Sequence, residues 1–142
     1  MNKKINFFDN GITKIRNKTK LKKWMIKCIN DHEYNLKIIN YILCSKEEIK
    51  TLNKKYLQKN NYTDIIAFNY EDKKNIFADI YMCYEIIKEN SKVYSVNLSE
   101  EIHRVMIHGI LHLCGFKDFT KKEKEKIQVT EDLYLKKLKK EI

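Results

Sequence analysis

The stretch from Val105 to Cys114 constrains the fold of this chain most, because it is nearly apolar around the whole circumference of a helix. A helix of this kind has no face suited to water, so the rest of the chain must enclose it. Gly115 is placed to end the helix in the left-handed conformation that glycine tolerates. We therefore expect a buried helix from about Ser99 to Cys114.

Two histidines, His108 and His112, lie inside this apolar helix and are four residues apart. At 3.6 residues per turn, that spacing places both imidazoles on one face, on consecutive turns. Gly109 removes a side chain next to the first histidine, which leaves room for a substrate or another backbone. Asp118 lies six residues beyond His112, past the glycine, where the chain can fold back toward both rings.

The resulting pattern, H-x-x-x-H-x-x-x-x-x-D, is one that zinc can bind. Three protein ligands leave the fourth tetrahedral position for water, and zinc lowers the pKa of such a water toward ~7. The sequence therefore predicts that His108, His112 and Asp118 hold one Zn²⁺ per chain and act in catalysis through it. Two histidines at this spacing can also be core residues that hydrogen-bond elsewhere, and this alternative stays open.

Apolar periodicity and turn residues predict that strands and helices alternate along the rest of the chain. The expected strands cover 5–8, 36–44, 64–70 and 75–82, and the last two can pair as a hairpin. The expected helices cover 21–30, the residues after the capping box at 45–48, the residues around 86–87, and those after the capping box at 120–123. This order favours an α/β (α+β) fold with a small mixed sheet of about four strands and about five helices.

The length of 142 residues fits a single domain spanning 1–142. No apolar run approaches the roughly 20 residues that a membrane-spanning helix needs, and no export signal precedes Ile5. We therefore expect a cytoplasmic protein without a membrane partner. The four cysteines form no C-x-x-C pair and suit a reducing compartment, where they act as small apolar side chains.

The formal net charge is +10, from 29 basic and 19 acidic residues. Such a surface attracts nucleic acid through its phosphates. An AT-rich genome explains the charge equally well, because the chain is rich in Lys, Asn and Ile, lacks proline, and has only Arg16 and Arg104 as arginines. Both explanations stay open.

The segment His108-Gly109-Ile110-Leu111-His112-Leu113-Cys114-Gly115-Phe116 resembles the H-G-x-L-H-L-x-G-[YF] signature of the YbeY endoribonuclease family. Tyr62-Thr63-Asp64-Ile65-Ile66-Ala67-Phe68 resembles that family's T-D-V-L-S-F strand. Leu52-Asn53 and Ala78-Asp79-Ile80 resemble its L-N and G-D-I segments. Order and spacing agree from about residue 45 to 140.

This resemblance implies a single zincin-like domain and a zinc-dependent endoribonuclease for single-stranded RNA. It implies action in ribosomal RNA processing, including the 3′ end of 16S rRNA, with single-stranded rRNA and the small ribosomal subunit as partners and no organic cofactor. Of the family's three metal-binding histidines, two carry over to His108 and His112, and Asp118 stands at the third position. Aspartate is an acceptable zinc ligand, although its charge favours a shift toward manganese or magnesium.

A second departure concerns the family's arginine that is thought to hold phosphate, because Leu57 stands at its position. Lys54, Lys55 or Lys59 are candidates to supply the missing cation and bind substrate, although lysine lacks the bidentate fork of arginine. Each of them can equally be an ordinary solvated lysine.

Four other side chains are candidates for a role near the substrate or for a structural one. Tyr56 and Tyr62 are available for base stacking, and Asp64 either activates water or anchors its strand. His103 points roughly 140° away from His108 on a straight helix, so we expect a core histidine rather than a ligand.

Two alternatives to a nuclease remain at this stage. A metalloprotease-like hydrolase is disfavoured, because Gly109 stands where H-E-x-x-H proteases carry their general base. A non-catalytic ribosome-assembly or rRNA-binding factor with a structural metal gains weight from Leu57.

Overall fold

The computed structural model describes residues 4–57 and 62–140, in which four strands and five helices alternate much as the sequence predicts. The strands are β1 (Lys4–Phe8), β2 (Asn35–Cys44), β3 (Ile65–Asn69) and β4 (Asn75–Cys83). The helices are α1 (Lys18–Asp31), α2 (Lys46–Leu57), α3 (Tyr84–Val93), α4 (Leu98–Leu113) and α5 (Lys121–Lys140). The predicted α/β class is confirmed.

The strands form one mixed sheet in the order β1-β2-β4-β3. The pairs β1/β2 and β2/β4 are parallel because helical crossovers separate them along the chain. The predicted hairpin of β3 and β4 is the antiparallel pair. This order leaves β3 as an edge strand.

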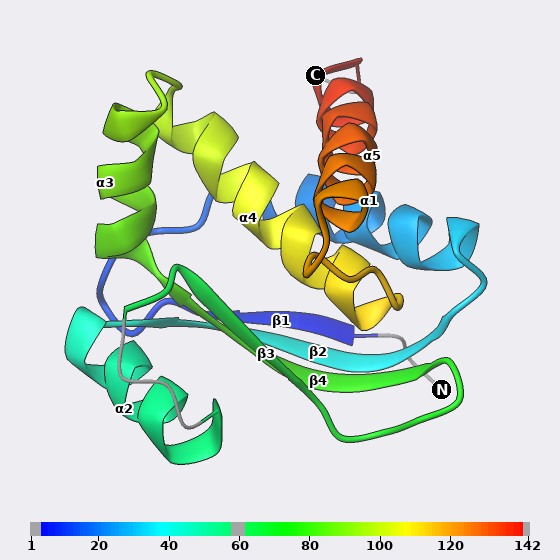
Figure 1. Cartoon of the computed structure of the whole chain (residues 1–142), viewed down its shortest axis with the longest axis horizontal. Coiled ribbons are helices and arrows are strands. Elements are labelled where there is room, and N and C mark those ends of the chain that lie inside the picture. Colours follow the sequence, from blue (N-terminus) through cyan, green and yellow to red (C-terminus); the bar gives the residue numbers. More distant parts are fainter. Residues whose placement is uncertain (1–3, 58–61, 141–142) are drawn as a thin grey trace.

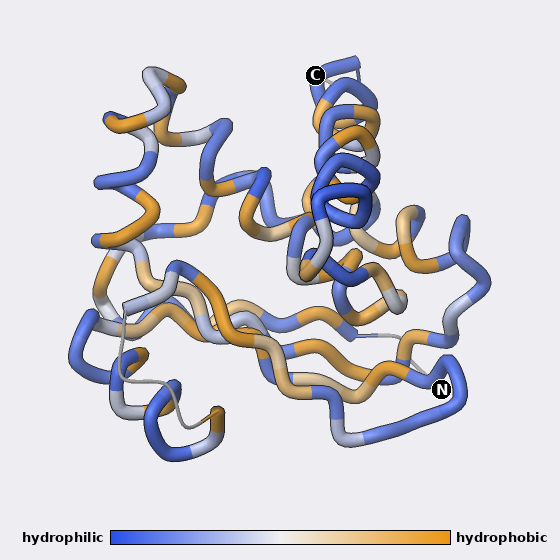
Figure 2. The backbone as a smooth tube through the Cα atoms, viewed as in Figure 1, coloured by the Kyte–Doolittle hydropathy of each residue, from blue (hydrophilic) through white to orange (hydrophobic). Residues whose placement is uncertain are grey.

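The two faces of the sheet are covered very differently (Figure 1). Helices α1, α3, α4 and α5 lie over one face, which we call the helical face, and the main core fills the space between them and the strands. Helix α2 packs against β3 and β4 on the opposite, open face. Hydrophobic residues follow this division and line the interior between the sheet and the four helices (Figure 2).

Helix α4 runs through the centre of the helical face and contacts α1, α3, α5, β3 and β4. The expected burial of its apolar segment is confirmed. A Cβ at Gly109 would come within 2.9 Å of the Ile65 Cδ1 atom and within 3.4 Å of the Ile80 Cδ1 atom. The glycine therefore lets α4 approach β3 and β4 closely. Of the two expected neighbours, a substrate or another stretch of backbone, it is the strands that take the space.

Both predicted capping boxes are formed. The backbone N–H of Glu48 donates to Ser45 Oγ at 3.1 Å, and the N–H of Ser45 donates to the Glu48 carboxylate at 3.1 Å. The N–H of Glu123 donates to Thr120 Oγ1 at 3.1 Å, and the N–H of Thr120 donates to the Glu123 carboxylate at 2.9 Å. These bonds satisfy backbone donors that the first turns of α2 and α5 would otherwise leave unpaired.

The glycine stop after α4 has a φ of +91°, and a Cβ there would lie 2.9 Å from the Tyr34 hydroxyl oxygen. Gly115→Ala is therefore expected to lower the free energy of unfolding by about 1–2 kcal/mol. Gly11→Ala is the matched control, because its φ is +73° but a Cβ would meet nothing within 4 Å. In urea unfolding, equal losses in both variants would show that the Tyr34 contact contributes nothing.

The cysteines behave as expected, since all four are buried with free thiols. No helix in the described part of the chain is long and apolar enough to cross a membrane.

Candidate metal centre

His108 and His112 lie side by side near the C-terminal end of α4. Their Nε2 atoms are 2.9 Å apart and their ring centroids 4.4 Å apart. Glu101 and Arg104 precede them at three- to four-residue intervals. The four side chains therefore form a polar stripe along one side of α4.

The chain folds back after α4 and brings Asp118 to the two rings. The N–H of Gly115 donates to the His112 carbonyl at 3.0 Å, and the N–H of Phe116 donates to the Leu111 carbonyl at 3.0 Å. The Asp118 Oδ2 atom then lies 3.3 Å from His112 Nε2 and 3.7 Å from His108 Nε2. The structure thus brings all three predicted ligands together.

The spacing of these three atoms fits a small cation. One ligand atom from each residue lies within 4.8 Å of the others. A tetrahedral ion with bonds of about 2.0–2.1 Å separates its ligand atoms by about 3.3 Å. The observed separations of 2.9, 3.3 and 3.7 Å lie on both sides of this value.

The other nitrogen of each ring is already occupied by an acceptor. His112 Nδ1 lies 2.9 Å from the Phe116 carbonyl oxygen, and His108 Nδ1 forms a short contact with the Glu131 carboxylate. Because a carbonyl can only accept, His112 Nδ1 carries the proton, and the carboxylate favours the same arrangement at His108. Both Nε2 lone pairs then point at the space beside Asp118, which is the usual arrangement of metal-binding histidines.

Glu131 is a residue of the candidate site that the sequence analysis missed. It is buried on α5, and its Oε1 atom accepts a hydrogen bond from Arg104 Nη1 at 2.9 Å. Arg104 Nη2 also donates to Asp132 Oδ1 at 2.6 Å. The sequence offered one indication of its burial: Glu131 lies on the same side of the predicted last helix as Ile127, Tyr134, Leu135 and Leu138.

The surroundings of His108 favour positive charge. Burial alone would lower the pKa of His108, but the hydrogen bond and charge of Glu131, with the charges of Asp64 and Asp118, raise it. Burial raises the pKa of the Asp64 carboxyl, and His108 offsets this only in part. Burial and then the charge of Asp64 raise the pKa of Glu101. A cation at this place relieves the repulsion among these carboxylates.

Asp64 also has the structural role considered above. Its carbonyl accepts a hydrogen bond from the Cys83 N–H at 2.9 Å, which ties the start of β3 to the end of β4. The side chain is partly buried and interacts electrostatically with His108. Both candidate roles of Asp64 are therefore compatible with its position.

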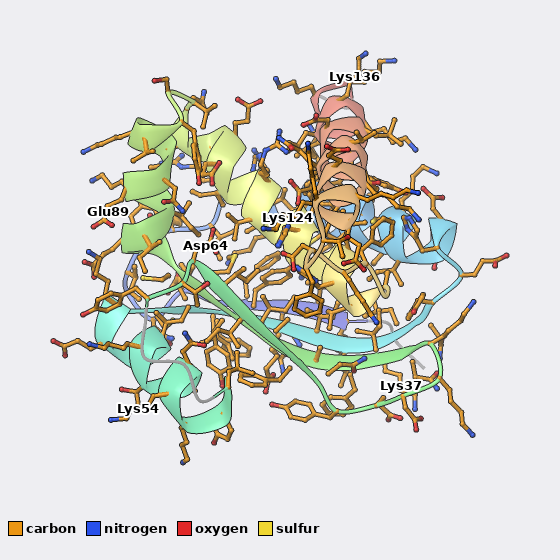
Figure 3. The ribbon with its side chains drawn as sticks, in the orientation of Figure 1. Lys37, Lys54, Asp64, Glu89, Lys124 and Lys136 are labelled. Carbon is orange, nitrogen blue, oxygen red and sulfur yellow. The ribbon has the colours of Figure 1, made fainter. Side chains whose placement is uncertain are left out.

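The lysines expected to replace the family's arginine do not join the candidate metal centre. Lys54 and Lys55 are exposed on α2, which lies on the open face, and Figure 3 shows Lys54 there. The histidines belong to α4, which lies on the helical face (Figure 1). Leu57 is exposed at the end of the same helix, and Lys59 lies outside the described residues. Arg104 is the arginine that the structure places at the site, through Glu131.

His103 lies away from the metal centre, as the helical geometry predicts. Its ring packs edge-on against Trp24, with centroids 6.2 Å apart, and it lines a cavity of about 390 Å³ beside the N-terminal half of α4. Burial and the charge of Lys20 lower the pKa of His103.

The lowered pKa of His103 predicts a loss of stability in weak acid. In the unfolded chain a histidine has a pKa of about 6.5. As pH falls below this value, the unfolded state takes up the proton before the folded state does, so the free energy of unfolding decreases. In urea unfolding with chelator, His103→Gln should lose less stability than the wild type between about pH 7.5 and about pH 5.5. If both proteins lost the same free energy of unfolding over this pH range, the lowered pKa of His103 would be contradicted.

Comparisons with known proteins identify the family. The family model described as Endoribonuclease YbeY matches residues 6–139. A curated Endoribonuclease YbeY from Cytophaga hutchinsonii is 37% identical over 122 residues, covering 85% of each chain. Another, from Karelsulcia muelleri, is 35% identical over 131 residues, covering 92% of this chain and 93% of that protein.

A solved structure supports the same conclusion at the level of the fold. The solution structure of TM1509 from Thermotoga maritima matches with a TM-score of 0.67 and 25% identity, over 97% of this chain and 91% of that one. The signature on α4, the two mutually facing histidines and the match along nearly the whole length agree. The chain therefore belongs to the YbeY endoribonuclease family.

Proposed function

We propose that this protein is a metal-dependent endoribonuclease that cuts single-stranded RNA during ribosomal RNA processing. The observation that carries the proposal is the convergence of His108, His112 and Asp118 within 4.8 Å, with both histidine Nδ1 atoms engaged elsewhere. In a family of endoribonucleases, such a group of ligands implies that the metal serves the cutting reaction.

Zinc is the ion we propose, one per chain, because imidazole nitrogen and carboxylate oxygen are both usual zinc ligands. When bound, it would supply Lewis-acid chemistry, which acidifies water and offsets the negative charge that gathers on a phosphodiester under attack. Three protein ligands would leave a position for substrate or water. The carboxylate of Asp118 makes manganese the principal competitor.

The surrounding residues have distinct roles in this proposal. Glu131 and the Phe116 carbonyl orient the two imidazoles through Nδ1. Arg104 holds the Glu131 carboxylate in place. Asp64 is our candidate to accept a proton at its carboxylate, since burial raises its pKa and a higher pKa makes the carboxylate a stronger base.

Further parts of the proposal concern the setting of the reaction. We propose that residues 1–142 act as one hydrolase domain, that the RNA is the single-stranded rRNA of the small ribosomal subunit, and that the protein works in the cytoplasm, where that RNA matures. The match over residues 6–139 supports the one-domain view. The protease alternative finds no support, because Gly109 offers no general base beside His108.

Cleavage assays separate the nuclease from its alternatives. Purified protein should cut a single-stranded RNA much faster than a duplex of the same sequence, stop cutting in EDTA, and recover when zinc or manganese is added back. RNA that is bound but never cut by metal-loaded protein would establish the non-catalytic factor instead. Digestion of casein that tracks metal content would establish the protease.

A further inference from the structure

Aromatic side chains gather on the open face of the sheet, on the opposite side from the metal centre. Four alternate residues of β4 are fully buried toward the helices: Ile76, Ala78, Ile80 and Met82. Phe77 and Tyr81 lie between them along the strand and therefore point to the open face. Two groups of contacting rings lie on this face, from α2, β4 and β3 or the residue after it. One group is Tyr56, Phe68 and Tyr81, and the other is Tyr70 and Phe77. We call these five residues the aromatic face.

Three rings of the aromatic face are well exposed, at 55% for Tyr56, 61% for Tyr70 and 39% for Phe77. Phe68 packs edge-on against Tyr56 at 5.4 Å and against Tyr81 at 6.1 Å. With Leu52, four of the five rings line a shallow pocket of about 220 Å³. An exposed cluster of this kind on a soluble protein marks a surface that meets a partner.

A row of hydrogen bonds beside these rings crosses β1, β2 and β4 and ends at Tyr70, the residue after β3. Asn6 Nδ2 donates to Asn40 Oδ1 at 3.0 Å, and Asn40 Nδ2 donates to Asp79 Oδ1 at 3.1 Å. The Tyr70 hydroxyl donates to Asp79 Oδ2 at 2.7 Å, which raises the pKa of Tyr70 to about 12 and keeps its ring neutral. The row places fixed amide and carboxylate groups next to exposed rings.

Lysines lie beside the aromatic face on α2 and at the β1 end of the row of hydrogen bonds. Lys54 and Lys55 lie on α2, and Lys55 Nζ is 5.3 Å from the centre of the Tyr56 ring. Lys4 lies on β1, next to the row of hydrogen bonds. Within residues 4–57 and 62–140, none of these three lysines has a carboxylate within ion-pair distance, whereas Lys37 is paired with Glu71.

We propose that the aromatic face binds the bases of single-stranded RNA by stacking, while Lys4, Lys54 and Lys55 contact its phosphates; this inference rests on the function proposed above. Stacked bases need exposed ring faces, amide and carboxylate groups suit the edges of bases, and unpaired lysines suit phosphates. The charge of the flanking cations complements a polyanion. An apolar protein partner would leave the row of amides and the lysines without use.

Strand β3 contributes side chains both to the aromatic face and to the surroundings of α4, because its residues alternate between the two faces of the sheet. Strand β3 is the edge of the sheet, and Ile65 packs under Gly109 of α4 on the helical face. Ile66 and Phe68 of the same strand pack with the open-face cluster under α2. A flexible single strand can bend around this one-strand edge, whereas a stiff duplex cannot. The arrangement thereby gives a reason for selectivity toward single strands.

Binding assays on ring variants test this inference. Tyr56→Ala and Phe77→Ala each remove an exposed ring that makes no side-chain hydrogen bond in the described structure. In EDTA and at fixed salt, each variant should bind a labelled single-stranded RNA of about 12 nucleotides roughly tenfold more weakly. Tyr56→Phe should restore the affinity. Tyr94→Ala, which removes a ring that is 62% exposed near the end of α3, should change it less than about twofold.

Other outcomes would overturn the inference or separate it from the proposed function. Unchanged RNA affinity in both alanine variants would overturn it. A second result would also overturn it: the wild-type protein forms a dimer, and the two alanine variants are monomers that keep their RNA affinity. The aromatic face would then bind a second copy of the chain. If the alanine variants bind RNA more weakly but the metal-loaded wild-type protein does not cut it, the RNA-binding role of the aromatic face stands and the nuclease function is refuted. If the wild-type protein cuts RNA in a metal-dependent way but the alanine variants bind RNA as tightly as the wild type, the nuclease function stands and the role of the aromatic face is refuted.

Discussion

His112→Ala is expected to leave the protein with less than about one tenth of an ion per chain and to reduce RNA cleavage roughly a thousandfold or more. The variant removes one of three ligand atoms, and a carboxylate with a single imidazole holds zinc weakly. The Phe116 carbonyl would lose its side-chain donor as well. Metal analysis of the purified variant and a cleavage time course measure the two effects.

His103→Gln is the matched control, because it removes an imidazole from the same helix on the side away from the site. It should keep both the ion and the cleavage activity. RNA binding by His112→Ala should also persist, since the aromatic face lies on the opposite side of the sheet. Full cleavage by metal-free His112→Ala protein would contradict the proposed mechanism.

Glu131→Ala is expected to affect both stability and metal affinity. It leaves Arg104 and His108 facing a buried space without their carboxylate, and breaking a buried pair costs about 3–5 kcal/mol. We expect the lower end of that range, because Arg104 is partly exposed and keeps Asp132. Loss of the acceptor at His108 Nδ1 should weaken metal binding about 10- to 100-fold.

Glu131→Gln separates the two effects. The amide keeps the shape of the side chain and one acceptor oxygen but removes the negative charge. It should cost less stability than Glu131→Ala while still weakening metal binding about tenfold. Urea unfolding in chelator measures the first quantity, and competition with a chelating dye measures the second. Wild-type metal affinity in both variants would show that Glu131 does not position His108.

The central helix and its ligands could be predicted because the information is local. Helical spacing places His108 and His112 on one face, and a glycine stop allows Asp118 to return within six residues. Glu131 and Arg104 were missed because their contact depends on how α5 packs against α4, 27 residues away. The only local indication of a role for Glu131 was its place among the apolar residues that α5 buries.

The sequence could not show that Lys54 and Lys55 lie on the other face of the sheet from the histidines, because this depends on which face α2 covers. In the sequence, Lys54 and Lys55 lie shortly before the strand predicted at 64–70, which begins with the candidate residue Asp64. In the fold, the connection from β2 to β3 carries α2 to the open face, while α4 lies on the helical face. Which of the two expected neighbours Gly109 has could not be predicted for a related reason, since Ile65 of β3 and Ile80 of β4 take the space beside it and both come from other parts of the chain.

The central claim is that one divalent ion, held by His108, His112 and Asp118, is required for RNA cleavage. Titrating chelator-stripped protein with zinc, or with manganese, tests it most directly when bound ion and cleavage rate are measured on the same samples. The account predicts that the rate rises in proportion to bound ion and levels off at one ion per chain. A rate that is already complete in the stripped protein, and that does not change as the ion binds, would contradict it.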